Sequence, residues 1–267
     1  MTESEPGLGI DPCQASPGRL NDYMLGGKDN FAADRELVEQ LKANAPQLQW
    51  IVRENRAFME RAVRYCAEQG IRQFIDLGSG LPSTDNVHDI AMRVDPACRV
   101  VYMDKDPMVV VHAQALLADG TAIAAIRGDV RKPEEVLGHD DVRGLIDFSR
   151  PVAVVMVSIL QYVADGDDPA GLVVRYLDAV APGSYLVVSH ATHEVFPEAA
   201  ARAEELLRQA ALPLVTRTKD EVAAFFAGLE LVEPGLVFTA EWRPHNEIEA
   251  PERSGWYAGV ARKPGTR

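Results

Sequence analysis

The sequence is poor in several features that would define a class of protein by themselves. Its 267 residues contain three cysteines, Cys13, Cys66 and Cys98, and no C-x-x-C pair. This excludes a disulfide-stapled scaffold and a cysteine-rich metal site, and we expect free thiols. No apolar run approaches the ~20 residues that a membrane helix needs, and the first 30 residues contain no apolar signal-peptide core. We therefore expect a cytoplasmic protein without a membrane partner.

Positive charge is also scarce. The chain has 40 acidic and 27 basic residues, a net charge of −13 and a pI near 4.9. No basic face that could follow phosphates is apparent, so nucleic acid is not an expected partner. The sequence contains no H-x-x-x-H pattern and no paired-carboxylate ligand set, which predicts no metal site. The proportions of hydrophobic residues (47%) and charged residues (25%) are those of a globular protein.

What the chain does contain is an alternation of apolar runs and amphipathic segments. The stretch 151–158 is apolar almost without a break, which is typical of a parallel strand covered on both faces. In the segment 50–67, Ile51, Phe58 and Ala62 recur on one side at helical spacing. We expect further helices at 34–44, 84–94, from 107 onward, 168–181, 197–211 and 218–227. We expect strands at 73–77, 99–103, 122–126, 151–158, 185–189, 229–232, 236–240 and 257–262.

This alternation predicts an α/β fold with a doubly wound, mostly parallel sheet and helices on both faces. We expect an N-terminal arm and helical cap at 1–69 and a Rossmann-like domain at 70–267. Ligands of such sheets bind at the carboxyl ends of the strands. Groups that follow four different strands should then share one rim. They are Gly78–Gly80, Asp104, Asp129 and Ser158.

The stretch "DLGSGLPSTDN" at 76–86 follows the first expected strand. Gly78, Ser79 and Gly80 form a turn whose backbone N–H groups, with the N-terminus of the next helix, can hold a ligand. Such a turn also occurs simply to pack a strand against a helix. The third glycine of the G-x-G-x-x-G pattern is missing, which argues against NAD. Asp76, just before the turn, suits a ligand with an amino group and a sulfonium cation, and it would repel a pyrophosphate.

Two further acidic residues complete a candidate cofactor site. Asp104 ends the second strand, where a carboxylate can accept hydrogen bonds from two ribose hydroxyls, an arrangement that is equally consistent with NAD. Asp129 follows the third strand and can accept a hydrogen bond from the exocyclic amine of adenine, and Ile126 or Val130 can lie against the ring. These positions together resemble the class I methyltransferases that use S-adenosylmethionine. The resemblance implies the strand order 3-2-1-4-5-7-6, with 229–240 and 257–262 as a reversed final hairpin.

A narrower resemblance covers nearly the whole chain. Its motifs are "SPGRLNDYMLGGKDNFAADRE", "FIDLGSGLPSTDNVHDIA", "VVYMDKDPMVVVHAQALL" and "GDVRKPEEVL". Together they resemble the family known as S-adenosyl methyltransferase, long catalogued as a domain of unknown function. The resemblance implies S-adenosylmethionine as cofactor and supplies no substrate. The chain departs from the family pattern at Gln161, where a histidine is usual, so the sequence does not support a histidine base there.

The N-terminal motif contains a candidate lid. We expect Tyr23 to pack over the ligand, the chain to bend back at Gly27, and Lys28 or Asn30 to contact ligand or acceptor. A plain surface turn is the alternative interpretation. Arg56 lies at the edge of an arginine-rich helix face and could reach an acidic acceptor.

Methyl transfer from a sulfonium is an in-line displacement that needs alignment and sometimes a base. His190 and His193, around the end of the fifth strand, and His88 are candidate bases, and a hydrogen-bonded structural role is the alternative for each. The [Asn/Asp]-Pro-Pro-Tyr motif of amino-methylating nucleic-acid enzymes is absent, and the lone Pro-Cys pair lies in the arm. A small-molecule acceptor is therefore favoured.

The function that these features predict is an S-adenosylmethionine-dependent methyltransferase acting on an oxygen or nitrogen of a small molecule. A non-catalytic protein that binds S-adenosylmethionine is the first alternative, and an NAD-dependent oxidoreductase is the second. The expected partner is the methyl acceptor, and a homodimer remains open.

Overall fold

The fold is built on one mixed sheet, which we describe from a computed structural model covering residues 9–246 and 248–265. The strands follow the order β3-β2-β1-β4-β5-β8-β6, and β7 pairs with β8 beyond the reach of β6. The strands are β1 (Gln73–Leu77), β2 (Arg99–Asp104), β3 (Ile123–Arg127), β4 (Ala153–Val157), β5 (Tyr185–Ala191), β6 (Glu230–Leu231), β7 (Val237–Phe238) and β8 (Trp256–Arg262).

The topology confirms the expected doubly wound sheet. β1 to β5 are parallel, and β8 runs antiparallel to β5 over the whole register from Tyr185–Arg262 to Ala191–Trp256. The two strands expected at 229–232 and 236–240 are present as the shorter β6 and β7, on either side of Pro234-Gly235. Proline lacks the N–H that a strand interior needs, so this pair ends β6 and lets the chain rejoin β8 further along.

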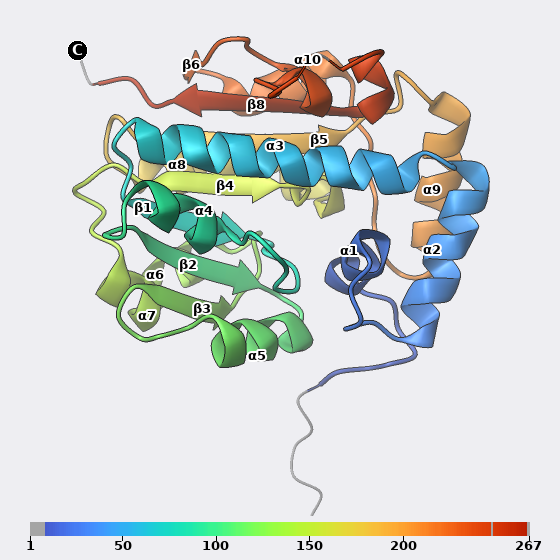
Figure 1. Ribbon diagram of the computed structural model, residues 1–267, viewed down its shortest axis with the longest axis horizontal. Helices are drawn as coiled ribbons and strands as arrows, with labels where there is room; N and C mark the ends of the chain where they lie inside the picture. Colours follow the sequence, from blue (N-terminus) through green and yellow to red (C-terminus); the bar gives the residue numbers. More distant parts are fainter. Residues whose placement is uncertain (1–8, 247, 266–267) are drawn as a thin grey trace, which may run out of the picture.

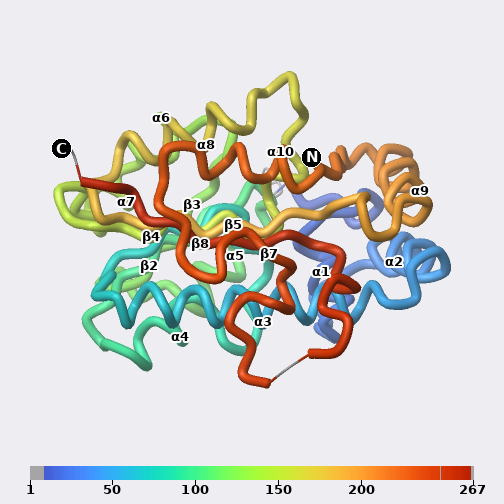
Figure 2. Tube along the Cα trace, turned by 90° about the horizontal axis from the view of Figure 1, so that it is seen from above, coloured from blue at the N-terminus to red at the C-terminus, as the bar shows by residue number. Residues whose placement is uncertain are grey.

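Helices cover both faces of the sheet, as Figure 2 shows. The helices are α1 (Pro17–Leu25), α2 (Ala32–Asn44), α3 (Leu48–Glu68), α4 (Val87–Val94), α5 (Pro107–Leu116), α6 (Pro133–Gly138), α7 (Asp140–Leu145), α8 (Pro169–Asp178), α9 (Pro197–Gln209) and α10 (Lys219–Ala223). Short 3-10 turns occur at Leu160–Tyr162, Asp165–Asp167, Ala224–Phe226, Thr239–Glu241 and Pro251–Ser254. The buried side chains of α3 and α4 pack on one face of the sheet, and those of α7, α8 and α10 pack on the other.

A helical cap, consisting of α1, α2 and α9, lies beyond the carboxyl ends of the parallel strands (Figure 1). Leu20 of α1, Leu37 and Leu41 of α2, and Leu206 and Leu207 of α9 share one apolar cluster. The cap thus combines the N-terminal helices with a helix from the second half of the chain, while α3 packs mainly against the sheet. The division at residue 69 stays a prediction.

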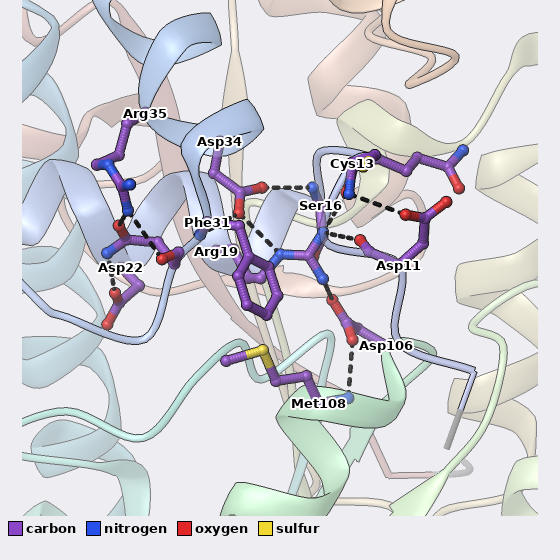
Figure 3. Close-up of polar contacts among 12 residues, drawn as sticks. Asp11, Cys13, Ser16, Arg19, Asp22, Phe31, Asp34, Arg35, Asp106 and Met108 are labelled. Carbon is purple, nitrogen blue, oxygen red and sulfur yellow. Dashed lines mark hydrogen bonds and ion pairs between the residues drawn. The ribbon is translucent and has the colours of Figure 1, made fainter. Parts of the chain in front are cut away.

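Buried ion pairs join the cap to the sheet, as Figure 3 shows. Arg19 of α1 donates a hydrogen bond to Asp34 of α2 at 2.9 Å and a second one to Asp106, just before α5, at 3.3 Å. Asp106 also accepts a hydrogen bond from the Ser16 hydroxyl. Arg19 and Asp34 are 3% and 0% exposed, so the charges compensate one another away from water. This cluster, which we call the Arg19 clamp, fixes α1 next to the end of β2.

The N-terminal arm expected at the start of the 1–69 segment gives way to helix at Pro17. Residues 1–8 lie outside the described part of the chain, and Pro17 begins α1 at the first helical position. Proline is favoured there because its fixed φ suits the helix and its missing N–H has no helical partner. Across the described residues, no helix has the length and apolar character required to cross a membrane.

Candidate functional site

One large cavity, of about 370 Å³, opens at the carboxyl ends of the strands under the helical cap. This volume lies within the roughly 300–1,000 Å³ of small-molecule sites. The four strand ends singled out by the sequence all contribute to its wall. They supply Asp76, Gly78, Ser79, Gly80, Asp104, Asp129, Val130 and Ser158. Parallel strands bring these groups together although they are up to 82 residues apart, counted as 158 − 76.

The glycine turn needs its glycines for different reasons. Gly78 has φ +75°, and a Cβ there would lie 2.5 Å from Cδ1 of Ile159. Gly80 has φ +66° with open space around it. A left-handed backbone is costly for other residues, so the turn requires glycine at both positions, and at Gly78 it requires the missing side chain as well.

The N–H groups of this turn donate hydrogen bonds to the protein itself, whereas we expected them to hold a ligand. Gly78 and Ser79 both donate to the carbonyl of Met103, at 2.8 and 3.2 Å. The following helix, α4, begins only at Val87, where Asn86 and Asp89 form a capping box. The N-terminus of α4 is thus capped by the chain itself. Gly78, Ser79 and Gly80 nevertheless line the cavity.

Asp104 ends β2 and faces the cavity. Its Oδ2 accepts a hydrogen bond from the N–H of Gly80 at 3.0 Å, and its Oδ1 accepts one from the N–H of Asp106 at 2.9 Å. Burial raises the pKa of Asp104, and these two N–H groups partly oppose that shift. Since a carboxylate offers about four lone-pair sites, it keeps capacity for two more donors on the cavity side.

Asp76 is a buried carboxyl group in the cavity wall. Burial raises its pKa to about 7, against the attraction of Arg56 and with the help of the nearby Asp104 charge. Among the described residues, none donates a hydrogen bond to its carboxylate. Arg56 itself donates to the carbonyls of Thr84 and Asp85, at 3.1 and 2.8 Å, so its guanidinium is held in place beside Asp76. The carboxyl group of Asp76 is therefore available to a positively charged ligand group.

Asp129 lies on the far side of Asp104 from the glycine turn. Arg131 contacts both of its oxygens, with Nε at 3.0 Å from Oδ1 and 3.1 Å from Oδ2, and this hydrogen bonding lowers the pKa of Asp129. Gly128 precedes it, and a Cβ there would lie 2.9 Å from Cγ of Met103. Glycine is therefore required at 128 for packing against Met103, and Gly128 and the buried Val130 both line the cavity.

Ser158 lies at the end of β4 with a φ of +60°, an uncommon value for a residue with a side chain. Its N–H donates to the carbonyl and hydroxyl of Ser189 at 3.2 and 3.1 Å. The carboxamide of Gln161 donates to the Ser158 hydroxyl at 3.2 Å and accepts from the N–H of Ala191 at 3.1 Å. Gln161, 2% exposed, also lines the cavity. At the position where the family resemblance led us to look for histidine, the chain has a residue that orients the end of β4.

The candidate lid residues lie outside the lining of the cavity. None of Tyr23, Gly27, Lys28 and Asn30 is among the residues that line the cavity. The Tyr23 hydroxyl donates to Glu39 of α2 at 3.2 Å. Asn30 donates to a carboxylate oxygen of Asp22 at 2.8 Å and to the carbonyl of Gly27 at 3.2 Å, while Lys28 is exposed. These residues form a turn between α1 and α2, and α1 turns a different face to the cavity.

The two histidines near β5 are also outside the cavity wall. His190 is fully buried, lies 2.8 Å from the guanidinium of Arg217, and burial lowers its pKa to about 4. His193 lies 3.2 Å from the Thr216 hydroxyl, and His88 contacts the Tyr102 hydroxyl at 2.8 Å. All three have structural hydrogen bonds, so the site offers no histidine as a base.

Several lining residues were not anticipated from the sequence. Gly18 of α1 lies over the glycine turn, where a Cβ would come 3.6 Å from Cα of Gly80. Asn55 lines the cavity from α3. A signal for it existed, because Asn55 is a polar residue between Ile51 and Phe58 on the apolar face of that helix. No sequence signal indicated that α9 would join the cap.

A metal centre has no counterpart in the structure as far as it is described. Within residues 9–246 and 248–265, no group of three or more His, Cys, Asp and Glu side chains is arranged to hold a metal ion. Asp104 instead accepts hydrogen bonds from backbone N–H groups, and Asp129 accepts them from Arg131.

Comparisons with known proteins give a consistent result. The sequence model of a family described as S-adenosyl methyltransferase matches residues 3–264. A DUF574-family protein from Streptomyces avermitilis MA-4680 is 40% identical, with a TM-score of 0.90 over 94% of this chain and 98% of that one. A protein from Thermobifida fusca YX, provisionally assigned as a methyltransferase, is 42% identical, with a TM-score of 0.91 over 97% and 98%. The search of curated proteins found no match.

Proposed function

The chain belongs to the S-adenosyl methyltransferase family, and we propose that it transfers the methyl group of S-adenosylmethionine to an oxygen or nitrogen atom of a small molecule. Family membership makes it an S-adenosylmethionine-dependent methyltransferase. The observation that carries the proposal is one cavity with two parts. Asp76, Asp104 and Asp129 lie at the strand ends, and mainly apolar side chains lie under the helical cap. A cavity with a charged part and an apolar part can bring a methyl donor and an acceptor together.

The residues present fit the cofactor. Asp76 is a buried carboxyl group without a hydrogen-bond donor among the described residues, and an ammonium or sulfonium group would compensate it. Asp104 would accept hydrogen bonds from the two ribose hydroxyls with its remaining lone pairs. Asp129 would accept one from the adenine amine, with Val130 against the ring. Gly78 and Gly80 allow the backbone to lie close to the aminoacyl part.

Alignment and exclusion of water are the main contributions of the protein. The cap places α1 over the glycine turn, and the Arg19 clamp holds it there. Bound S-adenosylmethionine supplies an activated methyl group, whose bond to sulfur breaks, leaving the electron pair on sulfur, as the acceptor atom bonds to carbon. None of the described residues that line the cavity is a histidine, so the proton that an O–H or N–H acceptor loses would leave to solvent at the mouth of the cavity.

A labelling experiment tests the acceptor class. The full chain is incubated with S-adenosylmethionine carrying a radioactive methyl group and with a cell extract divided by ultrafiltration into small molecules and macromolecules. We expect label in the small-molecule fraction, and much less when Asp104→Asn replaces the wild type. Label transferred only to protein or nucleic acid would contradict a small-molecule acceptor.

A further inference from the structure

The cavity wall away from the strand ends is mainly apolar, and its uncharged polar members are Asn21, Asn44, Gln47, Asn55, Thr192 and Thr216. It is formed by residues of α1, α2, α3 and α9, by 213–214 and by the start of β8. Its apolar members include Leu20, Met24, Leu41, Leu48, Ile51, Val52, Met59, Phe196, Ala199, Ala200, Ala203, Leu207, Leu214 and Trp256. We call this part the apolar compartment. Gly255, Ile51 and Phe196 meet in this wall, since a Cβ on Gly255 would lie 3.5 Å from Ile51 and 3.6 Å from Phe196.

Charged side chains are confined to the other part of the cavity. The charged lining residues are Arg56, Asp76, Asp104, Lys105, Asp106, Asp129 and Arg131. All but Arg56 follow or end a strand, and Arg56 is held beside Asp76 by the carbonyls of the glycine-turn loop. The lining residues from α1, α2 and α9 include no charged side chain. A charged molecule in the apolar compartment would lose its hydration without gaining a partner.

One polar group in this wall has no partner. Asn55 is 6% exposed and lines the cavity, and its Oδ1, which is itself buried, makes no hydrogen bond within the described structure. The two ends of a carboxamide have nearly the same shape, so a half-turn of the side chain would bring this oxygen to the cavity. Asn55 lies one helical turn from Ile51 and Met59 on α3. A buried amide without a partner costs free energy, which a ligand that donates a hydrogen bond would recover.

We propose that the methyl acceptor is an uncharged, mainly apolar molecule with one hydroxyl or N–H group, which donates its hydrogen bond to Asn55. This inference rests on the proposed function, because it assigns the apolar compartment to the acceptor. The strand-end part then holds the charged cofactor, and the compartment selects against acidic and basic acceptors. Arg56 donates through Nη2 to two backbone carbonyls and stands beside Asp76, whose carboxyl group faces its charge.

Three aromatic probes of similar size test this proposal on the full chain saturated with S-adenosylhomocysteine. Calorimetry compares naphthol, naphthalene, which lacks the hydroxyl, and naphthalenesulfonate, which is charged. Naphthol should bind roughly fivefold more tightly than naphthalene, the factor expected for one net hydrogen bond. Naphthalenesulfonate should bind more than roughly tenfold more weakly than naphthol. In Asn55→Leu, the preference for naphthol over naphthalene should disappear.

A variant pair on α9 locates the binding site. Ala203→Glu places a charge in the apolar compartment and should abolish naphthol binding, whereas Ala201→Glu changes an exposed residue of the same helix and should not. Thermal unfolding checks that both variants fold, and the comparison of the three probes on the wild type does not depend on these variants.

Failure of the wild type to bind S-adenosylhomocysteine would count against the proposed function. Normal binding of S-adenosylhomocysteine with preference for the sulfonate, or an unchanged naphthol preference in Asn55→Leu, would overturn the acceptor assignment alone. Weaker S-adenosylhomocysteine binding in Asn55→Leu, with the naphthol preference intact, would assign Asn55 to the cofactor and overturn it equally.

Discussion

The carboxylate of Asp104 accepts a hydrogen bond from the backbone N–H of Gly80 at 3.0 Å. This bond joins the end of β2 to the glycine turn that follows β1, so the two parts of the wall that would hold the ribose and the aminoacyl group are positioned relative to each other. A second bond, from the N–H of Asp106, links the same carboxylate to the residue that receives the Arg19 clamp. Asp104 therefore connects the cofactor part of the cavity with its cover.

Replacing Asp104 should weaken cofactor binding. Asp104→Asn keeps the shape of the side chain but loses the charge that two ribose hydroxyls would meet. Charge-assisted hydrogen bonds contribute about 1.5–3 kcal/mol, so affinity for S-adenosylhomocysteine should fall roughly 10- to 150-fold in calorimetry. Asp178→Asn, at an exposed position on α8, is the control and should bind normally. Wild-type affinity in Asp104→Asn would rule out the ribose contact.

The two glycines of the turn should differ in their tolerance of alanine. Gly80→Ala meets only the cost of a left-handed backbone, about 1–2 kcal/mol of the free energy of unfolding. Gly78→Ala meets the same cost and a collision with Ile159, whose Cδ1, Cγ1 and Cβ would lie 2.5, 2.7 and 3.1 Å from the new atom. Urea unfolding should therefore show a larger loss for Gly78→Ala. Equal losses would mean that Ile159 moves away freely.

Burial of Asp76 should make the ligand-free protein less stable as the pH rises. Its pKa is raised from 3.8 to about 7, so the folded protein keeps a proton that the unfolded chain releases. The unfolded state binds fewer protons between about pH 4 and pH 7, and stability falls with pH through that window. Asp76→Asn removes this cost, while Arg56 keeps its bonds to Thr84 and Asp85.

The melting temperature of Asp76→Asn should exceed that of the wild type at about pH 8, and the difference should shrink towards about pH 5. The exposed control Asp178→Asn should show no such trend. A difference that is independent of pH, or a loss of stability at about pH 8, would show that the Asp76 carboxyl titrates normally.

Breaking the Arg19 clamp should destabilise the cap. Asp34→Ala leaves the guanidinium of Arg19 buried with one carboxylate fewer, and removal of one partner of a buried ion pair typically costs about 3–5 kcal/mol. Hydrogen exchange should show faster exchange at 16–31, and urea unfolding should shift accordingly. Glu36→Gln on the same helix is exposed and should leave both unchanged. Unaltered exchange at 16–31 in Asp34→Ala would mean that apolar packing alone holds α1.

The sheet could be predicted closely because each strand carries its own local signal. The run at 151–158 is apolar, and the expected limits of β1 at 73–77 agree with the structure. The strand order followed from the family resemblance, and the structure confirms it. The convergence of Asp104 and Asp129 with the glycine turn at one rim followed from parallel pairing, which brings all carboxyl ends to the same edge.

A helical cap at the N-terminus was predicted, but its composition and contacts could not be, because they join distant parts of the chain. Arg19 and Asp106 are 87 residues apart, and nothing in either segment indicates the other. The orientation of α1 depends on its packing against α2 and α9, which directs Leu20 inward and Tyr23 to Glu39. α1 borders the cavity with residues other than Tyr23, and the lid assigned to Tyr23 from its place in the motif stays a prediction.

A crystal structure of the full chain with S-adenosylhomocysteine tests the central claim most directly. We predict one ligand per chain in the cavity under the cap, with its ribose hydroxyls on Asp104, its adenine amine towards Asp129 and its amino group towards Asp76. The apolar compartment beside Asn55 should be free of it. Density for the ligand outside this cavity, or with its adenine in the apolar compartment, would contradict the account.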